Sequence, residues 1–163
     1  PTKGSFITRG TTRDAYARYS ERGPDYIYNV ERLLKKFATA ATLVPQPMLR
    51  LAAEKTQLGV IYFGSTSPAM QEALEELAER GIQLDALRLR AFPFPDSVAQ
   101  FLARHPRVFV VEQNRDGQMR SLLVNELGID PARLVPVLHF DGTPITARFV
   151  VQAISAHLAK EPA

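Results

Sequence analysis

From Leu58 onward, short apolar runs alternate with stretches in which apolar residues recur every three or four positions. The short runs predict strands buried on both faces of a sheet, and the longer pattern predicts helices packed on that sheet. The predicted strands of this kind cover Leu58–Phe63, Val108–Val111 and Leu134–Leu138. Leu84–Arg90 is a further predicted strand, because its apolar and polar residues alternate. Strands that alternate with helices through short connections predict a mostly parallel sheet of about five strands in a three-layer α/β/α fold.

Polar residues and glycines mark the ends of the helices between these strands. The predicted N-caps are Ser67 (with Pro68 as the first helical residue), Asp96, Asp116 and Thr146. Gly81 and Gly128 are predicted to end two of the helices, because glycine readily adopts the left-handed conformation of a helix terminus.

The first 48 residues follow a different pattern. One helix is predicted between Asp25 and Pro45, since apolar residues recur there at helical spacing. Ser5–Thr8 is a candidate short strand, and the residues between it and the helix have the composition of a loop. We therefore divide the chain into an N-terminal arm, helix and connector, residues 1–48, and an α/β domain, residues 49–163.

The charge is unevenly distributed along the chain. Residues 1–50 hold nine Lys/Arg and four Asp/Glu, a net charge of +5. Residues 51–163 hold eleven Lys/Arg and thirteen Asp/Glu, a net charge of −2, so the whole chain carries +3. A basic arm can face nucleic acid, but acidic residues interrupt this one and it carries no recognised motif, so we expect a solvated or subunit-facing arm.

Composition excludes several classes of protein. The chain contains no cysteine, so it holds no disulfide, cysteine nucleophile or thiolate ligand for zinc or an iron–sulfur cluster. No apolar run approaches the roughly 18 residues that span a bilayer, and the start lacks a signal-peptide profile. We expect a cytoplasmic protein without membrane contact. Because the chain begins with Pro1 rather than Met, we also expect a piece of something longer.

Two loops that follow predicted strands are candidate binding sites. In the first, Gly64, Ser65, Thr66 and Ser67 precede a helix N-terminus, where free backbone N–H groups favour an anion. The alternative is that their hydroxyl groups only cap the helix. The candidate residues of the second loop are Glu112, Asn114, Asp116, Gly117 and Gln118.

The second loop also has two interpretations. Ligands of open α/β folds collect at the carboxyl ends of the strands, where Glu112 is predicted to stand. Its carboxylate would repel a phosphate unless it is paired, and Arg115 and Arg120 are the candidate partners. The loop is otherwise a tight Asn/Asp/Gly turn that joins a strand to a helix.

The chain shows no self-sufficient catalytic set. It has neither a Gly-x-Gly-x-x-Gly nor a P-loop motif, and His105, His139 and His157 lack metal-ligand spacing. We assign no catalytic residue, no confident cofactor-binding residue and no metal ligand.

One family resemblance spans nearly the whole chain. Its most specific part is Glu112-Gln113-Asn114 followed by Gly117-Gln118-Met119. The other parts are RLRAFPFP (Arg88–Pro95), Phe140-Asp141-Gly142-Thr143-Pro144 and ERLLKKFATAATLVPQP (Glu31–Pro47). On these motifs the chain resembles the C-terminal part of the α subunit of 2-oxoacid:ferredoxin oxidoreductases, especially the 2-oxoglutarate type.

The resemblance implies a fold like the transketolase C-terminal domain, with one antiparallel strand that is either Ser5–Thr8 or an unplaced segment. It also implies an enzyme that oxidatively decarboxylates a 2-oxoacid to its acyl-CoA and passes electrons to ferredoxin. Such enzymes use thiamine diphosphate, Mg²⁺ and iron–sulfur clusters, and the cofactor carries the chemistry. The implied partners are the N-terminal part of the same subunit and the β subunit.

This chain departs from a complete enzyme of that family. The Gly-Asp-Gly…Asn motif for diphosphate and metal is missing, and the loop Gly10–Asp14 lacks the histidine that related subunits often carry. We therefore expect an assembly domain that supports the thiamine site, binds no cofactor itself and is inactive alone. The alternatives are an independent anion-binding, nucleotide-binding or regulatory module, and the equivalent domain of another thiamine enzyme.

Overall fold

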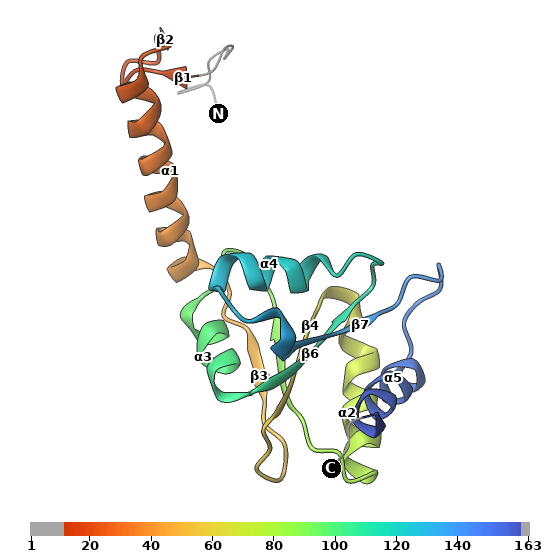
Figure 1. Cartoon of the computed structure of the whole chain (residues 1–163). Helices are drawn as coiled ribbons and strands as arrows, with labels where there is room; N and C mark the ends of the chain where they lie inside the picture. Colours follow the sequence, from red (N-terminus) through yellow and green to blue (C-terminus); the bar gives the residue numbers. More distant parts are fainter. Residues whose placement is uncertain (1–11, 161–163) are drawn as a thin grey trace. The chain divides into compact units, whose positions relative to one another are not determined.

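The computed structural model describes residues 12–160, and the chain divides into two compact units, Pro1–Leu43 and Val44–Ala163 (Figure 1). In the first unit, β1 (Thr12–Arg13) pairs antiparallel with β2 (Tyr19–Ser20), and the long helix α1 (Gly23–Leu43) follows. The amide of Asn29 in α1 donates to Thr12 Oγ1 and to the carbonyl of Arg13, both at 2.7 Å. These bonds fix the start of the helix against the hairpin.

The second unit is built on a five-stranded sheet in the order β3-β5-β4-β6-β7. Its strands are β3 (Met48–Arg50), β4 (Leu58–Phe63), β5 (Asp85–Leu89), β6 (Arg107–Glu112) and β7 (Leu134–Leu138). The four strands from β4 to β7 are mutually parallel, and they confirm the four predicted strands.

The antiparallel strand is β3. It pairs with β5 at the sheet edge, with Leu49 opposite Leu87. All three of its residues are exposed. The strand therefore has no alternation of buried and exposed positions that a hydrophobic pattern in the sequence could reveal. The other candidate, Ser5–Thr8, lies outside the described residues.

Helices cover both faces of the sheet (Figure 1). Helices α2 (Ser67–Glu79) and α5 (Ala147–Ala159) pack on one face around Val60, Phe109 and Val111. Helices α3 (Asp96–Arg104) and α4 (Gln118–Leu127) pack on the other face, around Ile61, Val108 and Val110. The 3-10 turns η1 (Gly64–Thr66) and η2 (Pro131–Arg133) precede α2 and β7. Strand β6 is apolar on both faces because helices cover both.

Gly59 in β4 allows the close approach of α3. A Cβ atom at this position would lie 3.0 Å from the Phe101 ring and 3.1 Å from the His105 ring. An added methyl group would therefore require the Phe101 and His105 rings to move by a few tenths of an ångström.

The predicted helix starts are partly wrong. Thr146 does cap α5, because its hydroxyl accepts from the amide of Phe149 at 3.2 Å. Ser67, however, is the first residue of α2, since η1 runs directly into that helix. Asp96 is likewise the first residue of α3, after the N-cap Pro95, where its charge still suits the helix dipole. Gly117, not Asp116, is the N-cap of α4.

Candidate functional site

The structure brings the two predicted loops together. Strands β4 and β6 are parallel neighbours, so the loops that leave their carboxyl ends lie side by side. Gln113 joins them, because its side-chain amide donates to Ser65 Oγ at 3.0 Å and to Thr66 Oγ1 at 3.2 Å. The loops enclose a cavity of about 280 Å³, which we call the strand-end hollow.

Five of the predicted residues line the strand-end hollow: Gly64, Ser65, Thr66, Asn114 and Gln118. Phe63 and Gln113 complete the lining, and the remaining candidates, Ser67, Glu112, Asp116 and Gly117, lie outside it. Gln113 was not among the predicted site residues. The available signal was its place in the Glu-Gln-Asn block, at the first position after a buried strand.

Glu112 is fully buried and is bound by its own chain. Its carboxylate accepts from the backbone amides of Met119 at 2.7 Å and Arg120 at 2.9 Å, and from the side-chain amide of Asn114 at 2.9 Å. Met119 and Arg120 belong to the first turn of α4, where an external anion would otherwise find free N–H groups. The carboxylate of Glu112 already occupies that position.

The predicted arginine partners of Glu112 are wrong. Arg115 pairs with the neighbouring Asp116 at 2.7 Å. Arg120 reaches across to β7 and η2, where it donates to the carbonyls of Leu134 and Pro131, both at 2.7 Å. Backbone amides balance the buried carboxylate instead, because they are closer and already ordered by the helix.

The turn between Glu112 and α4 is held by Asn114 and Gly117. The side-chain oxygen of Asn114 accepts from the amides of Asp116 at 3.1 Å and Gln118 at 3.2 Å. Gly117 has φ +59°, a left-handed conformation that other residues rarely adopt. The loop is therefore ordered by internal bonds.

The strand-end hollow carries no charged group. Its lining supplies hydroxyl and amide groups, and none of its seven residues is acidic, basic or histidine. Such a set can hydrogen-bond a neutral polar group or a backbone segment, but it offers no general base. Within residues 12–160, no three His, Asp or Glu side chains group in a way that could hold a metal ion.

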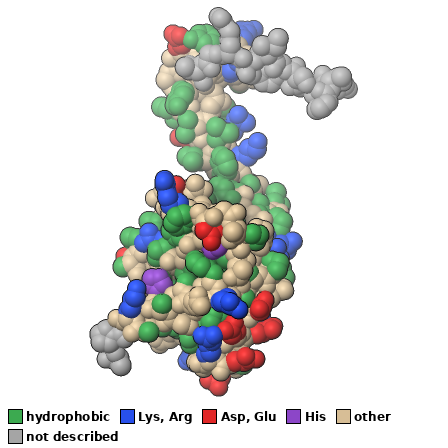
Figure 2. Space-filling model, turned by 90° about the vertical axis from the view of Figure 1, so that its right-hand side faces the viewer, with side chains coloured by type: hydrophobic (Ala, Val, Ile, Leu, Met, Phe, Trp, Pro, Cys, Tyr) green, Lys and Arg blue, Asp and Glu red, His purple; other side chains and the backbone are tan. Residues whose placement is uncertain are grey.

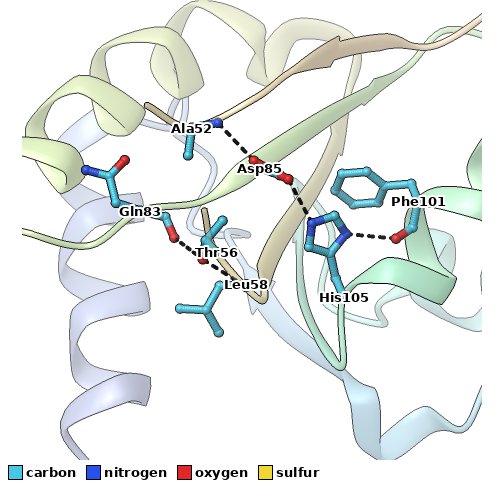
Figure 3. A network of polar contacts seen from close by, with 7 residues as sticks. All are labelled: Ala52, Thr56, Leu58, Gln83, Asp85, Phe101 and His105. Carbon is cyan, nitrogen blue, oxygen red and sulfur yellow. Dashed lines mark hydrogen bonds and ion pairs between the residues drawn. The ribbon is translucent and has the colours of Figure 1, made fainter. Parts of the chain in front are cut away.

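A second polar network lies at the other end of the sheet (Figure 3). The ring of His105, which is nearly buried, has Nδ1 at 2.8 Å from the carbonyl of Phe101 and Nε2 at 3.0 Å from Asp85 Oδ2. The other oxygen of Asp85 accepts from the amide of Ala52 at 2.9 Å.

This network is structural in character. Because a carbonyl oxygen can only accept, Nδ1 of His105 carries a proton, and its other nitrogen faces a carboxylate. The Asp85–His105 pair thus connects α3, β5 and the segment after β3. The spacing of the histidines in the sequence gave no sign of it.

No helix of the described part of the chain is long and apolar enough to cross a bilayer.

No family model matches the chain. The α subunit of the 2-oxoacid:ferredoxin oxidoreductase of Saccharolobus solfataricus is 28% identical to it over 155 residues, which cover 93% of this chain and 24% of the relative. This chain is similar to that α subunit along nearly its whole length. The resemblance carried by the Glu-Gln-Asn block is thereby confirmed, and the chain spans about a quarter of the length of its curated relative.

Two solved structures have the same fold as this chain. The 2-oxoglutarate:ferredoxin oxidoreductase of Magnetococcus marinus, solved with 2-oxoglutarate, coenzyme A and succinyl-CoA bound, superposes over 97% of this chain and 28% of its own, with a TM-score of 0.80 and 19% identity. A split-gene transketolase, an inactive β4 tetramer, covers 72% of this chain and 43% of its own, with a TM-score of 0.55 and 19% identity. The predicted three-layer, transketolase-like fold is confirmed.

Proposed function

We propose that this chain is the non-catalytic assembly domain of a 2-oxoacid:ferredoxin oxidoreductase α subunit. The complete cytoplasmic enzyme would decarboxylate a 2-oxoacid of the 2-oxoglutarate class to its acyl-CoA and pass the electrons to ferredoxin. Thiamine diphosphate, Mg²⁺ and iron–sulfur clusters would be held by the rest of the α subunit and by the β subunit. Similarity along 93% of the chain to part of a known α subunit supports this assignment.

The observation that carries the assembly role is the apolar face of α1. No side chain of this helix is buried among the described residues. Six of its large hydrophobic side chains recur at helical spacing and are between 39% and 64% exposed: Tyr26, Ile27, Val30, Leu33, Leu34 and Phe37. Figure 2 shows hydrophobic side chains at the surface of this helix.

An exposed apolar stripe of this length is typical of a helix that packs against a partner. Each of these side chains would gain about 1.5–3 kcal/mol on going from full exposure to full burial, so a half-exposed face leaves a large driving force for docking. We assign the docking surface of α1 to the remaining parts of the α subunit and to the β subunit.

The strand-end hollow fits the same role. Glu112 occupies the amides at the start of α4, and the lining of the hollow is uncharged. These features favour contact with a polar segment of a neighbouring domain over capture of a phosphate. At this hollow, the second candidate function, an independent anion-binding or nucleotide-binding module, has only the hydroxyls of Ser65 and Thr66 in its support.

The assembly role is tested in the complete reading frame that contains this chain. Leu33→Gln with Phe37→Gln should reduce the fraction of α subunit that co-purifies with the β subunit and lower oxidoreductase activity in parallel. The matched control, Arg32→Gln with Lys36→Gln, changes the polar face of the same helix and should leave assembly intact. Normal assembly of the apolar-face variant would contradict the proposal.

The ligand-binding alternative is tested on the 163-residue chain. In a calorimetric titration, we expect no tight binding of thiamine diphosphate and Mg²⁺. In a thermal-shift assay, we expect no phosphorylated ligand to raise the melting temperature in a way that Ser65→Asp abolishes. Tight thiamine diphosphate binding by this chain would overturn the non-catalytic assignment.

A further inference from the structure

A second cavity, of about 320 Å³, lies between the edge strand β3 and helix α2. We call it the arginine pocket, because two arginines, Arg50 of β3 and Arg88 of β5, line it. The other lining residues are Met48, Leu49, Tyr62, Ser67, Gln71 and Glu75. A hollow of this size is within the range that holds small-molecule ligands.

Sheet register places the two arginines on one face. Arg88 is opposite Met48, and Arg50 is opposite Ala86, whose side chain belongs to the core beneath α2 and α5. Residues two apart on a strand, and residues opposite each other on paired strands, share a face. Both guanidinium groups therefore lie on the α2 side of the sheet.

The guanidinium of Arg88 is incompletely satisfied. Its Nε atom is buried and has no hydrogen-bond partner in the described part of the structure. One terminal nitrogen lies 3.9 Å from the sulfur of Met48, which is a weak acceptor. A buried donor without an acceptor is unfavourable and uncommon in folded proteins, so this position favours an added acceptor.

The second arginine is only loosely paired. Arg50 lies 3.8 Å from Glu75, and the two side chains are 50% and 69% exposed. Exposed pairs at this separation contribute little and exchange readily with solvent ions. Glu75 is the single carboxylate that lines the pocket, so two positive charges face one negative charge.

Tyr62 and Ser67 complete the pocket with hydroxyl groups. Burial raises the pKa of the Tyr62 hydroxyl, while the nearby charges of Arg88 and Arg50 and a hydrogen bond with Ser67 act in the opposite direction. At neutral pH both groups are uncharged, and a hydroxyl can donate to an oxyanion as well as accept.

We propose that the arginine pocket binds a tetrahedral oxyanion, the phosphate group of a small ligand. Arg50 and Arg88 would supply planar, forked donors, a geometry suited to phosphate oxygens, and the hydroxyls would add further donors. Binding displaces Glu75 from Arg50 and gives the buried Nε of Arg88 an acceptor. The site does not depend on the proposed assembly role.

The test is an NMR titration of the ¹⁵N-labelled 163-residue chain at constant ionic strength. The probes are inorganic phosphate, sulfate and acetate, and the reporters are the Nε–H signals of the two arginines, identified by their loss in Arg50→Gln and Arg88→Gln. Phosphate and sulfate should shift both signals and saturate in the millimolar range. Acetate should produce a much smaller change.

Variants separate this site from general ionic effects. Arg50→Gln and Arg88→Gln should each weaken phosphate binding about tenfold or more, as loss of a charged hydrogen-bond partner does. Glu75→Gln should tighten it several-fold because it removes the internal competitor. Glu79→Gln makes the same charge change on α2 outside the pocket and should leave the affinity unaltered.

Several results would overturn the proposal. One is that phosphate causes no saturable shift of the arginine Nε–H signals. Another is that Glu75→Gln and Glu79→Gln increase the phosphate affinity equally. A third is that acetate binds as tightly as phosphate. The last result would indicate a receptor for a carboxylate side chain of a partner subunit. If Arg88→Gln fails to fold, Arg50→Gln and Glu75→Gln still test the proposal. Both side chains are at least half exposed, so we expect these variants to fold.

Discussion

The carboxylate of Glu112 accepts a hydrogen bond from the backbone amide of Met119 at 2.7 Å, so the residue that ends β6 caps the helix that follows it. A fully buried carboxylate is tolerated here because three N–H groups surround it. Glu112 is therefore a structural element of the strand–helix junction, not a ligand-binding residue.

Glu112→Ala should lower the free energy of unfolding by about 3 kcal/mol, because it leaves the buried amide donors of Met119 and Arg120 without an acceptor. Urea unfolding followed by circular dichroism measures the change. Glu126→Ala, at an exposed position of the same helix, is the control and should shift stability by no more than about 0.5 kcal/mol. Equal effects of the two substitutions would contradict the capping role.

Gly117→Ala should destabilise the protein by about 1–2 kcal/mol, because its φ of +59° is unfavourable for a residue with a Cβ atom. The nearest atoms to an added Cβ lie at 3.9 Å, so the effect is conformational rather than a clash. Gly23→Ala is the matched control, since Gly23 lacks a positive φ and no atom lies within 4 Å of its added Cβ. Thermal unfolding of both variants is the measurement.

Asp85→Leu should cost about 2–3 kcal/mol, because it leaves the amide of Ala52 without its acceptor and His105 Nε2 without its partner. Loss of that link should also release the segment after β3. Hydrogen exchange at the amide of Ala52 should accelerate by more than the loss of global stability explains. Unchanged protection of Ala52 would show that this segment is held by other contacts.

Thr143→Val should raise the pKa of the Asp141 carboxyl. That pKa lies below the usual value of 3.8 because the backbone amide of Thr143 donates to the carboxylate at 2.8 Å and its hydroxyl donates at 2.7 Å. The valine variant removes only the hydroxyl, so the pKa should rise part of the way. Carboxyl ¹³C shifts measured against pH report it, and Thr143→Ser should retain the low value.

The sign of the pH dependence follows from the same shift. The folded turn favours the charged form of Asp141, so its contribution to stability is present above the unfolded-state pKa and disappears as the pH falls through the folded-state pKa. The Thr143→Val variant should therefore lose less stability on acidification than the parent protein.

The sequence by itself determined the parallel part of the fold. The run Leu58–Phe63 coincides with β4, because a strand covered by helices on both faces must be continuously apolar. The run Leu134–Leu138 coincides with the edge strand β7, in which Pro136 is exposed. Gly128 ends α4 as predicted, with φ +62°. Local composition is sufficient for these features because each depends on burial or on backbone conformation at one position.

The tertiary structure decided what the polar residues do. No local pattern shows that Gln113 contacts Ser65 across two strands, that Glu112 turns back onto the amides of α4, or that Arg88 and Arg50 share a pocket. These relationships depend on which strands are neighbours and on which face each side chain takes. Strand order and register arise from packing of the whole sheet, so a polar residue acquires its partner only when the chain is folded.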